Sequence, residues 1–180
     1  QRAAHDAIFQ HLGDSVDAPE AAFIALDSHS REVRALVGSR HPGSAGFNRA
    51  TQARRQAGSV IKPFVYASAL ESGILMKDSL LLNAQRCYRG KDSSWCPKNA
   101  NGVHDNREVG LQEALSLSIN VTAVHTLQRV GVSTFTDLVR RSGISSPIPN
   151  NLTAALGSGV VSPLEITNAY ATIASGGLMA

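Results

Sequence analysis

A serine and a lysine stand three positions apart in the segment Gly58-Ser59-Val60-Ile61-Lys62. Residues at this spacing lie on one face of a helix, so the Ser59 hydroxyl and the Lys62 amine could come within hydrogen-bond reach. The helix dipole and a nearby backbone N–H could hold an oxyanion at Ser59. Burial disfavours the charged form of Lys62, so its amine could accept the serine proton. The pair has the chemistry of an activated nucleophile, although an exposed helix surface gives the same spacing by chance.

A second polar group occurs at Ser118-Ile119-Asn120, between two predicted helices. Residues two apart do not share a helix face, so a break between the helices would let both polar side chains point into one cleft. The serine could relay a proton and the asparagine amide could bind a peptide carbonyl. The alternative is that Ser118 and Asn120 only cap the two helices.

The helix that presents Ser59 is expected over about residues 59–72, with Gly73 just after its end. Pro63 has no amide hydrogen for the Ser59 carbonyl, which predicts a loosened first turn. The Ser162-Pro163-Leu164-Glu165 segment predicts a capped helix start, and Gly176-Gly177 predicts the end of that helix. Further helices are expected at residues 3–12, 111–117, 121–130 and from about 133 to 143.

Two short, mostly apolar runs predict a hairpin, with strands at residues 22–26 and 33–37 and a turn at 27–30. Residues 41–46 are expected to form a Gly-rich loop, and residues 74–110 to be mostly irregular. The early part of the chain thus supplies strands and the later part a helical layer.

The composition is that of an ordinary globular domain, with 43% hydrophobic and 17% charged residues among 180. A net charge of +3 is too mild to indicate a nucleic-acid partner. A long apolar run and a signal peptide are both absent from the sequence. We therefore expect any export or anchoring segment of the parent protein to lie outside these residues.

Two cysteines, Cys87 and Cys96, lie in a polar stretch without the spacing of a zinc site. A local disulfide in an oxidising compartment is predicted, and two unpaired thiols are the alternative. The six histidines have no ligand spacing, and Asp105 and Glu108 are expected to face solvent from a loop. No metal or other cofactor is expected.

The two polar motifs, in their order, resemble the first two motifs of the serine penicillin-recognising enzymes. The flanking segments are similar to those of class A, bifunctional penicillin-binding proteins, from about residue 21 to residue 177, and residues 1–13 and 52–55 resemble the 1b subgroup. These segments are residues 47–50, 62–64, 113–115, 156–159 and 169–177.

This resemblance implies a role for each motif residue. Ser59 would attack the penultimate D-Ala carbonyl of a peptidoglycan stem peptide, and an amino group of a neighbouring stem would resolve the acyl-enzyme. Lys62 would take the Ser59 proton, Ser118 would pass a proton to the leaving amine, and Asn120 would hold the substrate backbone and orient Lys62. β-Lactams would acylate Ser59. Trp95, Pro97 and Asn99 resemble a wall of the active site.

The fold implied is α/β, with an antiparallel sheet beside a helical subdomain at 111–177. Residues 1–20 would be a linker and 21–180 an incomplete transpeptidase domain. The family's third motif, Lys/Arg-Thr/Ser-Gly on a strand, is expected beyond residue 177, since the sequence has no Lys-Thr-Gly or Lys-Ser-Gly. The resemblance also implies a membrane-anchored parent protein that acts in the periplasm.

Two other functions would share these motifs. A D,D-carboxypeptidase or a serine β-lactamase would hydrolyse the acyl-enzyme, but the lactamase Glu-x-x-x-Asn segment does not follow Ser118. A fragment without catalytic activity is the remaining possibility, and labelling with a fluorescent penicillin would separate it from the enzymes.

Overall fold

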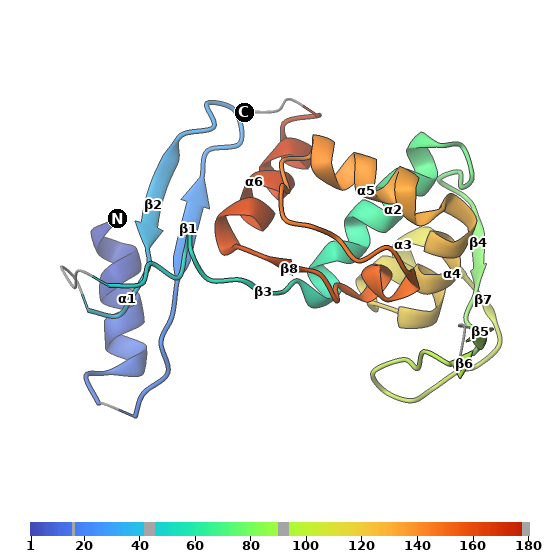
Figure 1. Ribbon diagram of the computed structural model, residues 1–180, viewed down its shortest axis with the longest axis horizontal. Coiled ribbons are helices and arrows are strands. Elements are labelled where there is room, and N and C mark those ends of the chain that lie inside the picture. The colour runs from blue at the N-terminus through green and yellow to red at the C-terminus, as the bar shows by residue number, and fades with distance from the viewer. Residues whose placement is uncertain (16, 42–45, 90–93, 178–180) are drawn as a thin grey trace. The chain divides into compact units, whose positions relative to one another are not determined.

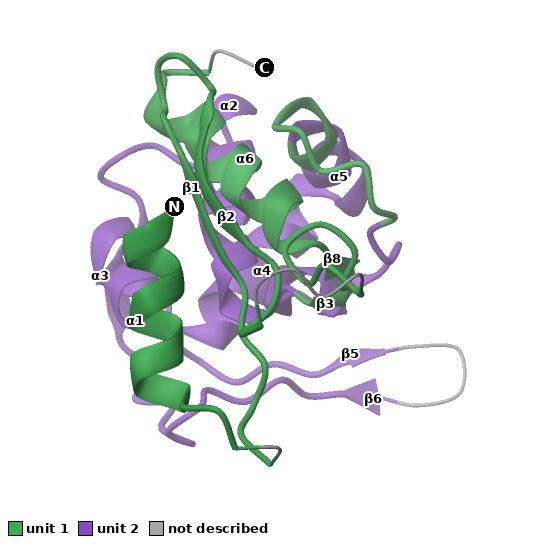
Figure 2. Cartoon of the chain, turned by 90° about the vertical axis from the view of Figure 1, so that its left-hand side faces the viewer, with its two compact units in different colours: residues 1–56, 139–147, 160–180 green, residues 57–138, 148–159 purple. Residues whose placement is uncertain are grey.

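The computed structural model describes residues 1–15, 17–41, 46–89 and 94–177. Contacts divide the chain into two compact units (Figure 2). Unit 1 comprises Gln1–Gln56, Val139–Pro147 and Val160–Ala180, and unit 2 comprises Ala57–Leu138 and Ile148–Gly159. Residues 42–45 of the predicted Gly-rich loop lie outside the described residues.

Unit 1 contains the predicted hairpin. β1 (Phe23–Leu26) pairs with β2 (Val33–Val37) in antiparallel register, with Phe23 opposite Val37. The turn forms where expected because the Asp27 carboxylate accepts hydrogen bonds from two backbone N–H groups within it, at 3.0 and 2.9 Å.

The first helix of unit 1 is α1 (Arg2–Leu12), which contacts β2 and lies beside the hairpin in Figure 1. It ends at Gly13, whose φ of +68° is a left-handed conformation that glycine adopts without strain. Ala4, Ile8 and Leu12 are spaced four residues apart on one face of this helix and are half-buried.

The last helix, α6 (Pro163–Ala174), packs on β1 within unit 1. Its predicted capping box is confirmed, since Ser162 Oγ accepts from the Glu165 N–H at 3.2 Å and Glu165 Oε2 accepts from the Ser162 N–H at 2.9 Å. Contacts thus group α6 with the hairpin in unit 1, and the helical subdomain over 111–177 stays a prediction.

Unit 2 is largely helical, and its short strands form two pairs. Its elements are η1 (Gly58–Ile61), α2 (Lys62–Glu71), β4 (Leu80–Leu82), β5 (Tyr88–Arg89), β6 (Ser94–Trp95), β7 (Glu108–Gly110), α3 (Leu111–Ser116), α4 (Asn120–Val130) and η2 (Leu152–Leu156). α5 (Val132–Arg141) begins in unit 2 and ends in unit 1.

The core of unit 2 lies between α2 and α4, and η2 contacts both helices. Phe64, Val65 and Ala69 of α2 are fully buried, as are Val124 and Leu127 of α4. A helix surrounded in this way has apolar residues on most of its circumference, and α2 fits that description. It carries Lys62 at its first position into this buried environment.

The described residues between 74 and 110 are mostly irregular, as predicted, but they also contain short strands that were not expected. β4 pairs with β7, with Leu81 opposite Val109, and β5 pairs with β6. In unit 1, β3 (Arg55–Gln56) pairs with β8 (Val160–Val161), which was not expected either. Strands of two or three residues are too short to show an alternating pattern, and β3 and β4 pair with strands far away in sequence.

Within the described ranges of the chain, no helix is both long and apolar enough to span a membrane. The division into a linker at 1–20 and a domain from residue 21 stays a prediction.

Candidate active site

Ser59 lies in η1, a short 3₁₀ helix directly before α2, and the residue is exposed. Its carbonyl accepts a hydrogen bond from the Lys62 N–H, an i to i+3 bond, because Pro63 has no N–H for the usual i to i+4 bond. The predicted loosening of the first turn thus takes the form of a 3₁₀ turn. Its effect is to present the serine at the open end of a buried helix.

Lys62 is the most deeply buried charged residue of the site, with 1% of its surface exposed. Its Nζ donates to Ser118 Oγ at 2.9 Å, to the Ser118 carbonyl at 2.5 Å and to Asn120 Oδ1 at 2.6 Å. Burial lowers the pKa of the amine to about 8. An amine with this pKa is partly neutral in the physiological range and can accept a proton.

The break between α3 and α4 lies at Ser118, which has a φ of +51°. This left-handed conformation is strained for a residue other than glycine, and such strain clusters at functional sites. It turns the chain so that both Ser118 and Asn120 reach the Lys62 amine. The expected convergence of the second motif is therefore seen, and neither side chain caps its own helix in the way the alternative required.

The Ser59 hydroxyl is not hydrogen-bonded to this cluster. Among the described residues this hydroxyl forms no hydrogen bond. The structure therefore brings Lys62, Ser118 and Asn120 together and leaves Ser59 one turn before Lys62, in η1. In enzymes without substrate, catalytic hydrogen bonds are often long and tighten only in the complex.

The turn that carries Ser59 is held by the segment after η2. The Gly58 N–H donates to the Gly157 carbonyl and the Ala57 N–H to the Gly159 carbonyl, each at 3.1 Å. This role of Gly157 was missed, because the sequence shows a glycine pair there but not the backbone that it approaches.

The contacts of Asn99 were not predicted either, because the family resemblance placed it only in a wall of the active site. Its side chain bonds to the start of α4, beside Asn120. Of its companions in that prediction, Pro97 is buried, and Trp95 lies against Tyr88 with ring centroids 6.1 Å apart.

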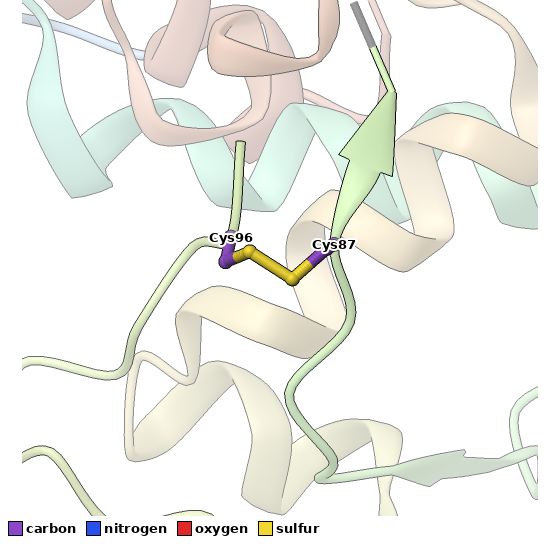
Figure 3. The surroundings of a disulfide bond; sticks show 2 residues. All are labelled: Cys87 and Cys96. Atoms are coloured by element: carbon purple, nitrogen blue, oxygen red, sulfur yellow. A yellow bond between two sulfur atoms is a disulfide. The ribbon is translucent and has the colours of Figure 1, made fainter. Parts of the chain in front are cut away.

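Cys87 and Cys96 form a disulfide, with Cα atoms 4.1 Å apart (Figure 3). The bond joins Cys87, the residue just before β5, to Cys96, which follows β6 and precedes Pro97. It therefore anchors the segment that leads to Asn99.

Within the described part of the chain, no group of three His, Cys, Asp or Glu side chains could hold a metal ion. Of the histidines, His104 lies 3.4 Å from the Asn99 amide and His125 lies 2.8 Å from Arg86. Asp105 and Glu108 are exposed, but Asp105 also accepts a hydrogen bond from Asn83 at 2.8 Å.

One tripeptide fits the letters of the third motif but not its structure. Arg141-Ser142-Gly143 begins at the last residue of α5, and Gly143 has a φ of +104° at the helix end. The motif belongs on a strand, so this tripeptide does not supply it.

Comparisons with known proteins point to one family. The family model "Penicillin binding protein transpeptidase domain" matches residues 21–180. Penicillin-binding protein 1A of Neisseria lactamica is 40% identical over 162 residues, which cover 88% of this chain and 20% of that protein.

Solved structures give the same result. Penicillin-binding protein 1A from Haemophilus influenzae has a TM-score of 0.80 and 33% identity, over 85% of this chain and 23% of that one. PonA1 from Mycobacterium tuberculosis has a TM-score of 0.85 and 26% identity, over 99% of this chain and 48% of that one.

The chain belongs to the penicillin-binding protein transpeptidase family. Its relatives confirm the α/β penicillin-binding fold and the class A resemblance, although they carry the name 1A where the sequence pattern favoured 1b. The matched part of the chain spans 20% of the length of the Neisseria lactamica protein.

Proposed function

We propose that the protein containing this chain is a peptidoglycan D,D-transpeptidase in which Ser59 is the acylated nucleophile. The observation that carries the proposal is the buried Lys62 amine, held one helical turn from Ser59 by both polar residues of the second motif. The family supports a transpeptidase role in peptidoglycan synthesis.

The proposed reaction begins with attack of Ser59 Oγ on the penultimate D-Ala carbonyl of a stem peptide. An ester bond forms, the peptide C–N bond breaks and the terminal D-Ala leaves as an amine. The proton of Ser59 passes to Lys62 and then, through Ser118, to that amine. A neighbouring stem's amino group then attacks the ester, which regenerates the Ser59 hydroxyl and forms the cross-link.

The contacts of Lys62 favour Ser118 as the relay. A charged amine has three N–H donors, and Lys62 uses them on three acceptors. When the amine is neutral it has two donors and a lone pair. The Ser118 carbonyl and Asn120 Oδ1 can only accept, so the Ser118 hydroxyl is the one partner of the three that can donate in return. Proton transfer between Lys62 and Ser118 therefore needs only a rotation of that hydroxyl.

We further propose that β-lactams acylate Ser59 as substrate mimics, and that the enzyme acts outside the cytoplasmic membrane with an anchored parent chain. The disulfide of Cys87 and Cys96 supports an oxidising compartment.

The 180 residues by themselves are proposed to be inactive. Each sheet in the described part of the chain has two strands, fewer than is usual for a protein sheet. The third motif would also supply an oxyanion donor, and loss of one such donor costs about 10²–10³ in rate. The test is to express residues 1–180 and to measure penicillin acylation first without and then with a C-terminal segment that carries the third motif, added in trans. Fast stoichiometric acylation without that segment would contradict it.

The products of the reaction distinguish transfer of the acyl group to an amine from its hydrolysis by water. The complete protein is given a stem pentapeptide with a labelled terminal D-Ala and an acceptor amine. A transpeptidase releases the label and forms the cross-linked product, whereas a carboxypeptidase releases the label and leaves a tetrapeptide acid. Release of label by Ser59→Ala protein would refute the proposed nucleophile.

A further inference from the structure

We propose that Asn99 is a positioning residue for acylation, which holds the start of α4 and thereby fixes Asn120 and Lys62. This inference rests on the proposed function of the same site. All the residues involved lie in unit 2.

Asn99 caps α4 from another segment of the chain. Its Oδ1 accepts the backbone N–H of Asn120 at 3.0 Å and that of Val121 at 3.2 Å. The first N–H groups of a helix have no partner within it, and the residue at the cap position of α4 is Ile119, which has no side-chain acceptor. Asn99 supplies the acceptor that the local sequence lacks.

The residue before Asn99 holds the side chain of Asn120. The Lys98 carbonyl accepts from Asn120 Nδ2 at 2.8 Å, while Asn120 Oδ1 accepts from Lys62 Nζ at 2.6 Å. The nitrogen of the amide thus faces Lys98 and its oxygen faces the lysine. Lys98 and Asn99 together fix the backbone, the position and the orientation of Asn120.

The orientation of Asn99 is fixed in turn by a chain of hydrogen bonds that starts at a carboxylate. Asp105 Oδ1 accepts from Asn83 Nδ2, and Asn83 Oδ1 accepts from Asn99 Nδ2, each at 2.8 Å. Asn99 Nδ2 also donates to the Val103 carbonyl at 2.8 Å. Because an ionised carboxylate can only accept, Asn83 must turn its oxygen to Asn99, and Asn99 must then turn its oxygen to α4. Asn83 is buried, with 6% of its surface exposed, so water cannot easily replace these bonds.

The position of Asn120 therefore depends on Asn99, a residue that does not touch the reacting atoms. Asn120 is in turn one of the three hydrogen-bond partners of Lys62. Misplacement of a catalytic group by about 1 Å can lower a rate by about 10². We therefore expect Asn99 to affect the acylation step more than the binding of the β-lactam.

The test uses the complete protein and the probe is a fluorescent penicillin. Asn99→Leu has nearly the same size and no acceptor, whereas Asn99→Asp keeps the acceptor and loses the donor bonds to Asn83 and Val103. Asn101→Ala is a control in the same loop, where the side chain accepts from Val103. For each variant we would measure the acylation rate constant, the binding constant, thermal unfolding and amide hydrogen exchange at Asn120 and Val121.

We expect Asn99→Leu to acylate about 10²-fold more slowly with little change in the binding constant, and Asn99→Asp to recover about ten-fold of that loss. Exchange at Asn120 and Val121 should speed up in the Leu variant and not in the Asp variant, and Asn101→Ala should resemble the wild type. A folded Leu variant with the wild-type rate, or an Asp variant as slow as Leu, would overturn the proposal.

Failure of the proposed function looks different in the same experiment. A wild-type protein without an adduct at Ser59 would remove that function. Unchanged amide exchange at Asn120 and Val121 in the Leu variant would remove the positioning role by itself, whatever the labelling shows.

Discussion

A Cβ atom placed on Gly157 would lie 2.2 Å from the backbone nitrogen and oxygen of Gly58, the residue before Ser59. Real Cβ atoms do not approach backbone atoms so closely, and Gly157 also has a φ of +70°. The absence of a side chain at Gly157 lets the backbone after η2 run directly against the turn that carries the proposed nucleophile.

Gly157→Ala should therefore displace the Ser59 turn and lower the acylation rate by about 10². Gly73→Ala is the matched control, because Gly73 has the same φ of +70° but open space where its Cβ would lie. Rates of fluorescent-penicillin labelling and the thermal unfolding of both variants check the prediction. Equal effects of the two substitutions would mean that backbone strain, and not the contact with Gly58, is responsible.

Lys62 should set the pH dependence of acylation. Its amine must be neutral to take the Ser59 proton, and burial lowers its pKa to about 8. The rate should therefore rise as the pH increases through about 8 and then level off. Lys62→Ala should lose about 10²–10⁴ in rate and the pH dependence together, with the fold retained. A Lys62→Ala protein that keeps the rise near pH 8 would assign it to another group.

Glu165 should stabilise unit 1 through the loop that its carboxylate holds. Burial alone would raise its pKa, but hydrogen bonds from Ser162, Ser145 and Ser146 outweigh this and lower the pKa from 4.5 to about 2. The resulting stability is fully present above pH 4.5 and is lost as the pH falls towards 2.

Glu165→Gln should lower the free energy of unfolding by about 1–3 kcal/mol at neutral pH, because an amide cannot accept all these bonds. Urea unfolding of the complete transpeptidase domain measures it. Glu32→Gln is the control, since Glu32 is 63% exposed and pairs with the exposed Arg34. A change at Glu165 no larger than at Glu32 would show that the loop is held by other contacts.

The disulfide should stabilise the polar segment before Asn99. The bond closes a small loop, with a sequence separation of 9, so its removal should cost roughly 2–3 kcal/mol at most. Thiol titration of denatured, unreduced protein should find neither Cys87 nor Cys96 free. Two titratable thiols per chain would contradict the bond.

The helices were predictable because their signals are local. The capping box at Ser162 and the glycines after residues 12, 72 and 130 mark ends that the structure confirms. Lys62 and the second motif were also predictable as a group, since one helix turn and one helix break bring them into reach. Their catalytic roles stay proposals.

The contacts that hold these residues in place could not be predicted in this way. Asn99 bonds to Asn120 and Val121, which lie beyond β7 and α3 in the sequence. Gly157 contacts Gly58 although the two residues lie far apart in the sequence. Such contacts depend on tertiary packing and leave no period in the sequence. The grouping of α6 with the hairpin was missed for the same reason.

The central claim is that Ser59 is the acylated residue, and the most direct measurement is the mass of the complete protein after treatment with penicillin, followed by peptide mapping. The account predicts one adduct per chain, on the peptide that contains Ser59, and no adduct in Ser59→Ala protein. An adduct that persists in Ser59→Ala protein, or one that maps to another residue, would contradict it.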